Sequence, residues 1–217
     1  MMASLHIAEC TENKSMLAKL YQPRLPQNSM TYDEYAVKLT LSVSERDHIQ
    51  GPNTAPVTLV EYGDYECPYC AQAYLIIKEV QERLGTKLRF VFRNFPVTSA
   101  RPRAYRVALA AEAAAVQNRF WDMYDYLFKH GQTNTDENLR KSAAGLGLQI
   151  DKFDRDFNEQ TRKVHLDEDI ESGKSSGVRN TPTFFINGDR YVGEWDLDSL
   201  LSALDEESVF AWKSGKR

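Results

Sequence analysis

Two apolar runs on either side of a helical pattern form the clearest feature of the chain. Val57–Tyr62 and Leu88–Arg93 are mostly apolar, which is typical of buried strands. Between them, Pro68 to about Leu84 predicts a helix that stops at Gly85. Its apolar positions recur at helical spacing: Ala73, Ile76, Ile77, Val80 and Leu84. Strand, helix and strand in this order predict a right-handed crossover between parallel strands.

Residues 99–177 have an almost wholly helical pattern. The expected helices are Pro102–Asn118, Phe120–His130, Asp136–Leu146, Asp151–Asn158 and Thr161 to about Ser176. The first is rich in alanine, which permits close helix packing. The block is too long for one crossover helix, so we expect a helical subdomain inserted into a sheet domain.

Shorter patterns flank these regions. Val37–Val43 alternates with period two and predicts a strand. Thr181–Ile186 and Arg190–Gly193 surround an Asn-Gly pair, which is a strong hairpin signal. A last helix, Leu197–Asp205, is expected to begin after Asp196 as its cap.

Together these elements predict an α/β fold, with a central mixed sheet flanked by helices and an inserted helical subdomain. We expect five regions: an N-terminal extension (1–44), the first part of the sheet domain (45–98), the helical insert (99–177), the second part of the sheet domain (178–207) and a C-terminal tail (208–217).

Length, charge and hydropathy limit the domain count, the class of partner and the location that we expect. A chain of 217 residues forms one large domain or a domain with an insertion, and its net charge of −4 indicates neither a nucleic-acid partner nor an anionic membrane surface. No stretch approaches the ~20 apolar residues of a membrane span, so we expect no membrane insertion. The first residues lack the basic and apolar segments of an export signal, which favours a cytoplasmic location. A trimmed or mis-assigned N-terminus would instead favour a periplasmic or other extracytoplasmic location.

The tetrapeptide Cys67-Pro68-Tyr69-Cys70 carries the candidate chemistry. It lies directly after the first predicted strand, at the start of a helix. There the helix N-terminus favours a thiolate, so we expect Cys67 to be acidic, exposed and the attacking sulfur. Cys70, one turn further along, is expected to be shielded and to resolve the mixed disulfide. Pro68 and Tyr69 between them would tune the thiolate.

Zinc is the main alternative for a CxxC sequence. A structural zinc site needs four ligands. Cys10 stands alone and is expected to be a free thiol, and the four histidines have no ligand spacing: His6, His48, His130 and His165. We therefore predict no metal site.

Two other positions are open to more than one interpretation. Glu61 lies on the strand six residues before Cys67. It is either an ordinary strand-end glutamate or a buried carboxylate that exchanges a proton with Cys70, in which case burial would raise its pKa. The Thr181–Pro182 bond, judged by itself, is expected to be trans, because most X-Pro bonds are.

Five separated segments resemble the DsbA-like family of thiol–disulfide oxidoreductases, a branch of the thioredoxin superfamily. They are Glu61–Cys70, Phe92–Pro96, Ala110–Ala114, Phe120–Met123 and Thr181–Gly188. The resemblance covers about residues 45–207 and implies a thioredoxin-like fold with an inserted helical domain. It also implies that Pro182 is a cis-proline against the active-site disulfide, that the Thr181 backbone binds substrate, and that Glu61 is the buried proton acceptor.

The resemblance has one notable departure. The best-known DsbA proteins carry His where this chain has Tyr69, and Pro-Tyr is the pair typical of glutaredoxins. Replacing an imidazole with Tyr69 removes a group that can stabilise the thiolate, which places strong oxidising power in doubt.

The expected function is disulfide exchange with cysteine-containing protein substrates, recycled by an unknown redox partner. No cofactor is expected beyond the Cys67–Cys70 disulfide, with glutathione a possible reductant. The direction of exchange stays open. The alternatives are a glutathione-dependent enzyme, either glutaredoxin-like or similar to kappa-class transferases, and a non-enzymatic module that keeps the fold. Kappa-class proteins usually lack the second cysteine, so Cys70 argues against transferase chemistry.

Overall fold

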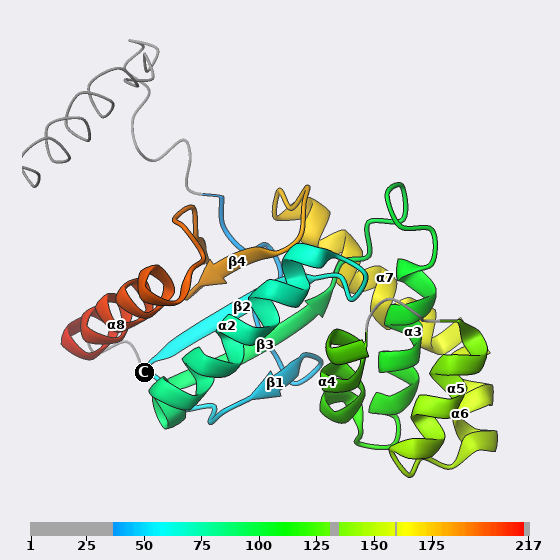
Figure 1. Cartoon of the computed structure of the whole chain (residues 1–217). Helices are drawn as coiled ribbons and strands as arrows, with labels where there is room; N and C mark the ends of the chain where they lie inside the picture. The colour runs from blue at the N-terminus through cyan, green and yellow to red at the C-terminus, as the bar shows by residue number, and fades with distance from the viewer. Residues whose placement is uncertain (1–36, 131–134, 159, 215–217) are drawn as a thin grey trace, which may run out of the picture. The chain divides into compact units, whose positions relative to one another are not determined.

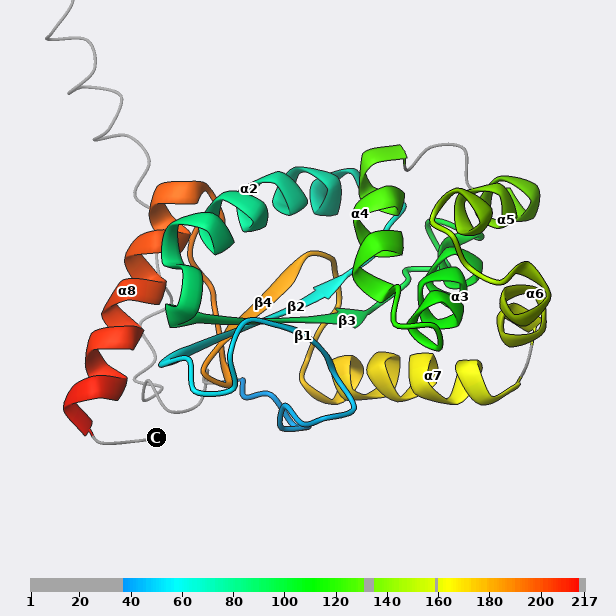
Figure 2. The ribbon, with the colours of Figure 1, turned by 90° about the horizontal axis from the view of Figure 1, so that it is seen from below.

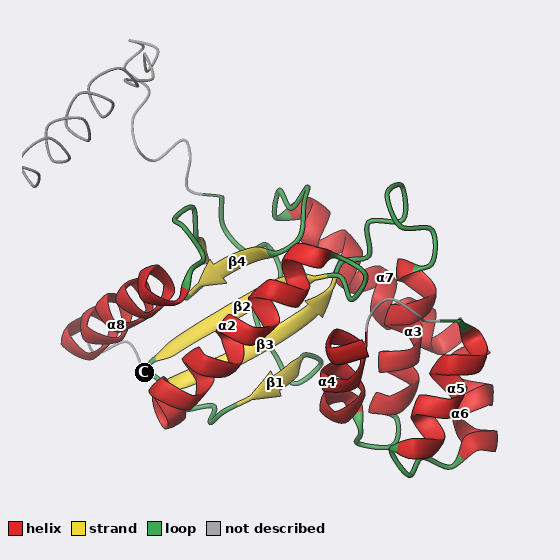
Figure 3. Ribbon diagram, in the orientation of Figure 1, coloured by secondary structure: helices red, strands yellow, loops and turns green. Residues whose placement is uncertain are grey.

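A five-stranded mixed sheet forms the centre of the molecule (Figures 1 and 3). The computed structural model describes residues 37–130, 135–158 and 160–214, which lie in one compact unit, Ala36–Arg217. The strands stand in the order β1-β3-β2-β4-β5. Their bounds are β1 His48–Gln50, β2 Val57–Gly63, β3 Leu88–Asn94, β4 Thr183–Ile186 and β5 Asp189–Arg190.

The crossover predicted from the sequence is confirmed. Strands β2 and β3 are parallel, and helix α2 (Pro68–Leu84) with the short 3-10 turn Gly85–Lys87 connects them. Strand β4 runs antiparallel to β2 on its other side, so that Glu61 lies between Phe92 and Phe184. The two longest strands are therefore central, and the sequence leading to Cys67 begins at the end of one of them.

Helices cover both faces of the sheet (Figure 2). After α2 they are α3 Ala104–Ala115, α4 Phe120–His130, α5 Asp136–Gly145, α6 Ile150–Asn158, α7 Gln160–Ser175 and α8 Leu197–Ser214. Alternate residues of β2 enter different cores: Leu59 packs in the larger cluster with α2 and α4, and Tyr62 in a smaller one beside α7. Within the described residues, no helix is long and apolar enough to cross a lipid bilayer.

Helices α3 to α7 form the expected insert between β3 and β4. Helix α3 contacts α4, α5, α6 and α7, and is the centre of this group. Its many alanines are buried, as close packing on several sides requires. Glu112 is the exception, a carboxylate that is 1% exposed in this apolar helix.

Two expectations from the sequence are wrong in detail. Val37–Val43 forms no strand, and only Lys38 makes an isolated bridge, with Asp189. Strand β1, which the sequence pattern did not predict, lies at the opposite edge of the sheet and pairs antiparallel with β3. The last helix also continues past Asp205 to Ser214, because no glycine or proline occurs before Gly215.

Candidate active site

The turn after β2 places Cys67 at the start of helix α2. The Cys67 N–H donates to the carbonyl oxygen of Asp64 (3.0 Å), and the Asp64 carboxylate accepts from the N–H of Glu66 (2.9 Å). Cys67 is the N-cap residue and Pro68 the first helical residue, as predicted. No side chain caps this helix end. The first backbone N–H groups are therefore free to face the Cys67 sulfur.

Hydrogen bonding makes Cys67 acidic. Hydrogen bonds with the Cys70 thiol, with Thr181 and with the backbone N–H groups of Cys70 and Tyr69 together lower the pKa of Cys67 to about 5, against the opposing effect of burial. The expectation of an exposed sulfur is wrong, because Cys67 is only 3% exposed. It reaches the surface through a cavity of ≈ 360 Å³. The cavity is lined by Tyr65, Glu66, Cys67, Pro68, Ala71, Phe128, Lys129 and His130.

The pKa of Cys70 is shifted in the opposite direction. It is fully buried, and burial raises its pKa far above the ordinary value, with the hydrogen bond to Cys67 and the charge of Glu61 adding to the effect. The backbone N–H of Asp64 lies 3.5 Å from its sulfur. Both cysteines are free thiols in this structure. One sulfur is thus poised as a thiolate and the other as a thiol.

The Thr181–Pro182 bond is cis, as the resemblance implied and as judgement of the bond alone did not. The Cys67 thiol donates to the carbonyl oxygen of Thr181 at 3.3 Å. Strand β4 begins at the next residue, Thr183, which pairs with Tyr62 of β2. The sheet itself therefore fixes the residue before the proline against the reactive sulfur.

Glu61 is buried at the centre of β2. Its side chain is 0% exposed, and neither carboxylate oxygen has a hydrogen-bond partner. Burial, together with the charge of Cys67, raises the pKa of Glu61 to about 8. The glutamate is therefore the buried group rather than the solvent-facing one, and it holds its proton at neutral pH.

An aromatic shell surrounds this carboxyl group, and the sequence did not identify it. Phe92, opposite Glu61 in the sheet, contacts Tyr65 (ring centroids 5.4 Å apart) and Tyr124 (4.9 Å). The hydroxyl groups of both tyrosines are buried without a hydrogen-bond partner. The negative charge of Glu61 helps to raise the pKa of each. Tyr124 comes from the insert, so only the fold brings it to the site.

Arg101 and Asp64 hold the loops beside the cysteines together. The Arg101 Nε donates to Oδ2 of Asp64 (2.8 Å), and the same oxygen accepts from the backbone N–H of Val97 (2.9 Å). The neighbouring Arg103 and Arg106 both bind Asp136. All three arginines therefore make ion pairs within the chain.

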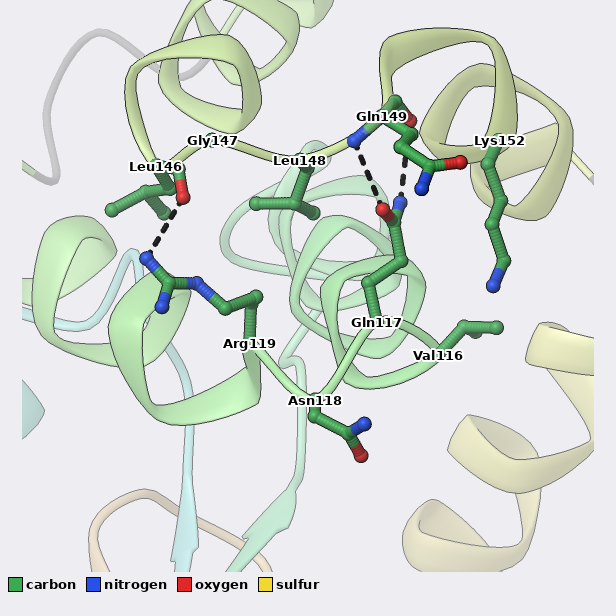
Figure 4. Close-up of a pocket in the computed structure, with 9 residues that line it drawn as sticks. All are labelled: Val116, Gln117, Asn118, Arg119, Leu146, Gly147, Leu148, Gln149 and Lys152. Carbon is green, nitrogen blue, oxygen red and sulfur yellow. Dashed lines mark hydrogen bonds between the residues drawn. The ribbon is translucent and has the colours of Figure 1, made fainter.

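A second cavity of ≈ 570 Å³ lies in the insert, away from both cysteines (Figure 4). It is lined by Val116, Gln117, Asn118, Arg119, Leu146, Gly147, Leu148, Gln149 and Lys152. Gln117 accepts from the N–H of Gln149 and donates to its carbonyl oxygen, while Arg119 donates to the carbonyl oxygen of Leu146. These bonds join two turns of the insert and bring no nucleophile into the cavity.

Comparison with known proteins adds a family and several relatives. A profile of the thioredoxin family matches residues 43–206. The Na(+)/H(+) antiporter NhaA 1 of Mycolicibacterium gilvum is 42% identical over 163 residues, which are 74% of this chain and 26% of the relative. The protein of the same name from Salinispora arenicola is 38% identical over 197 residues, 90% of this chain and 30% of the relative. The chain therefore spans between a quarter and a third of the length of these curated relatives.

Solved structures share the fold. BdbD from Bacillus subtilis has a TM-score of 0.69 at 24% identity, covering 80% of this chain and 98% of that one. The α-DsbA1 protein of Wolbachia pipientis has a TM-score of 0.70 at 19% identity, covering 83% and 100%. A thioredoxin-like oxidoreductase from Silicibacter pomeroyi has a TM-score of 0.68 at 23% identity, covering 75% and 92%. At these identities the likeness is one of fold.

Proposed function

Because this chain belongs to the thioredoxin family, we propose that it is a thiol–disulfide oxidoreductase that exchanges disulfides with cysteine-containing proteins. The observation that carries the proposal is the opposite behaviour of two neighbouring thiols. The pKa of Cys67 is lowered to about 5, and that of the buried Cys70 is raised. Thiol exchange needs one sulfur that attacks at neutral pH and a second that is held in reserve.

In the reducing direction, the Cys67 thiolate attacks one sulfur of a substrate disulfide. A bond forms between Cys67 and that sulfur, the substrate S–S bond breaks, and the other substrate sulfur leaves as a thiolate. Cys70 then loses its proton and attacks the Cys67 sulfur. The Cys67–Cys70 disulfide closes, and the first substrate sulfur leaves. Two electrons pass from the pair to the substrate, and the oxidising direction is the reverse.

Glu61 supports the second step in this proposal. Its charge acts on the buried Cys70 thiol, and its own pKa of about 8 lies near neutral pH. In the mixed disulfide Cys67 carries no charge, so the pKa of Glu61 falls, and its carboxylate form can accept the proton that Cys70 releases and return it in the reverse direction. Thr181 and cis-Pro182 would hold the substrate segment beside Cys67, whose sulfur lies 3.3 Å from the Thr181 carbonyl oxygen.

A glutathione-dependent reaction is the second candidate. The cavity of ≈ 360 Å³ beside Cys67 is large enough for part of a small thiol, and Tyr69 is shared with the glutaredoxin tetrapeptide. A glutathione-dependent reaction at one sulfur would survive the loss of Cys70, whereas dithiol exchange with proteins would not.

The first experiment is a titration of the cysteine pair in glutathione buffers, in a Cys10→Ser background, with free thiols counted by alkylation and mass spectrometry. We expect one disulfide, between Cys67 and Cys70. A reduction potential near or above about −150 mV indicates a disulfide donor, and one near about −200 mV or lower indicates a reductase or isomerase. Absence of that disulfide under all conditions would exclude the dithiol mechanism.

Variants then separate the two candidates. Cys70→Ser should accumulate mixed disulfides with protein substrates and lose turnover, because nothing resolves the bond to Cys67. Cys67→Ser should form no mixed disulfide. If Cys70→Ser retains full turnover with glutathionylated substrates, the glutathione-dependent alternative is correct.

A further inference from the structure

Three side chains far apart in the sequence converge at the junction of the sheet and the insert. His48 lies on β1, Glu112 on α3 and His165 on α7. The His48 Nε2 is 2.9 Å from one Glu112 oxygen and the His165 Nδ1 is 2.8 Å from the other, and one ligand atom of each residue lies within 4.8 Å of the others. We propose that this His–Glu–His cluster binds a divalent transition-metal ion of the zinc type.

The orientation of His165 is the first support. Its Nε2 lies 3.0 Å from the carbonyl oxygen of Arg46, which can only accept, so Nε2 carries the hydrogen. Against the effect of burial, the Glu112 carboxylate raises the pKa of His165 to about 9, so without a metal Nδ1 carries a proton directed at Glu112, and a bound cation would displace that proton and take its place. That nitrogen is buried and makes no hydrogen bond of acceptable geometry. A histidine that donates its other N–H to a backbone carbonyl is the usual arrangement of a metal ligand.

The other two side chains are also held in place. The His48 ring stacks on Phe120, with centroids 3.4 Å apart and planes 10° from parallel. Glu112 is 1% exposed and accepts from the Asn94 Nδ2 at 2.8 Å. The Asn94 Oδ1 is itself buried without a partner. Carboxylates that bind metals are commonly positioned by such a second hydrogen bond.

The donor set favours zinc over calcium or magnesium. Two imidazole nitrogens with one carboxylate suit Zn²⁺ and its neighbours in the first transition series, whereas Ca²⁺ and Mg²⁺ prefer oxygen ligands. Ligand atoms about 2.0–2.1 Å from a zinc ion lie roughly 3–3.5 Å apart. The two nitrogen–oxygen separations of 2.8 and 2.9 Å are close to this range, and all three ligand atoms lie within 4.8 Å of one another, so the side chains would have to close in by roughly an ångström around an ion.

Charge and access agree with a cation at this place. Arg46 pairs with Asp169 (2.9 Å), Glu168 (3.4 Å) and Asp47 (3.6 Å), and among the ion pairs of the described residues Glu112 pairs only with the two histidines. The side chains of His48 and His165 are 15% and 20% exposed, which leaves a route from solvent. Spacing along the chain could not predict this cluster, because its members come from three separate elements. The proposal departs from our expectation from the sequence that the chain has no metal site.

The test uses protein with an oxidised Cys67–Cys70 pair, because a reduced dithiol also binds zinc. The full chain is titrated with Zn²⁺ against a chromophoric chelator, and with Co²⁺ while its visible absorption is recorded. We expect one equivalent per chain. His48→Gln, Glu112→Gln and His165→Gln should each weaken zinc binding by at least about tenfold.

His130→Gln is the matched control, since His130 is exposed and bonds only within α4 among the contacts described. It should bind zinc as the unaltered protein does. Circular dichroism and the melting temperature without metal establish that each variant is folded. Failure to compete with the chelator, equal binding by the His165→Gln variant, or preference for Ca²⁺ over Zn²⁺ would each overturn the proposal.

Discussion

At the scale of single residues, three neighbouring acidic groups between Glu61 and Cys70 have very different pKa values. The Cys67 thiol ionises readily, Cys70 holds its proton, and the Glu61 carboxyl is neutral where an exposed glutamate is charged. Burial produces the last two effects and hydrogen bonding the first. The protein therefore keeps only one of the three groups charged at neutral pH, which is the condition for an ordered two-step exchange.

Glu61→Gln should stabilise the fold in a pH-dependent way. Below pH 4.5 the carboxyl is neutral in both the folded and unfolded chain. Between pH 4.5 and about 8 only the unfolded chain loses the proton, so the free energy of unfolding of the natural protein falls as pH rises. At about 1.4 kcal/mol per pKa unit, the variant should be more stable by a few kcal/mol at pH 8 and by nothing near pH 4.

Urea unfolding of the reduced protein at pH 4, 6 and 8 measures this difference, because the charge of the Cys67 thiolate contributes to the pKa of Glu61. Glu79→Gln, at an exposed glutamate paired with Arg83, is the control and should show little dependence on pH. An equal effect of Glu61→Gln at all three pH values would mean that the carboxyl is not held neutral. The variant should also slow the step in which Cys70 loses its proton.

At the scale of elements, helix α7 shows how closely the layers approach. Gly173 faces the sheet, and a Cβ placed there would lie 2.6 Å from the Phe95 ring and 3.0 Å from that of Tyr62. One turn of this helix also supplies Ser172, whose hydroxyl hydrogen-bonds the Tyr62 hydroxyl (2.9 Å). The glycine is thus required by contact with the sheet and not by its backbone conformation.

Gly173→Ala should destabilise the protein by about 1–2 kcal/mol. Overpacking costs roughly 1–3 kcal/mol, which outweighs the gain of about 1 kcal/mol from better helix propensity. Gly145→Ala in α5 is the matched control, because no atom lies within 4 Å of its Cβ position. It should be neutral or stabilising by up to about 1 kcal/mol. Urea unfolding compares the two, and equal effects would show that α7 can move away from the sheet.

Local patterns predicted most elements, and contacts across the fold account for the failures. The central strands, α2 and the five helices of the insert follow the apolar periodicity of their own residues. Val37–Val43 has strand periodicity but gains no strand partner, because the Arg93 side chain takes the carbonyl oxygens of Leu41 and Ser42. Strand β1 is three residues long, too short for a periodic signal.

The residues of the candidate site likewise fall into those that the sequence predicted and those that only the fold brings together. The cysteines were identified from spacing and the cis-proline from resemblance. Tyr124, Arg101 and the His–Glu–His cluster act through partners in other elements, and no sequence spacing connects them. Their positions follow only from how the insert packs against the sheet.

At the scale of the whole molecule, a buried arginine fastens the first described segment to the sheet. Arg93 is fully buried and forms a two-pronged ion pair with Asp47, at 2.8 and 3.2 Å. It also donates to the Tyr62 hydroxyl at 2.9 Å. One planar guanidinium group donates all of these bonds, so replacing Arg93 removes them together.

Arg93→Met should lower the free energy of unfolding by roughly 3–5 kcal/mol, because the buried Asp47 carboxylate loses its closest cation and keeps only the Ser44 N–H (2.8 Å) and the more distant Arg46 (3.6 Å). Adding Asp47→Leu should recover part of that loss, since no unpaired buried charge then remains. Arg83→Met, at a half-exposed surface pair, should change stability by less than about 1 kcal/mol. A double variant as unstable as the sum of the single ones would refute the pairing.

The aromatic shell around Glu61 gives the insert a part in the chemistry beyond lining the cavity at Cys67. Tyr124 belongs to α4, and with Phe92 and Tyr65 it keeps solvent from the carboxyl group. The insert thus helps to keep a low dielectric constant around the carboxyl group. Any motion that lifted α4 and admitted water would restore an ordinary acidity to Glu61 and leave it ionised. The pace of exchange at Cys70 would then change although neither sulfur had moved.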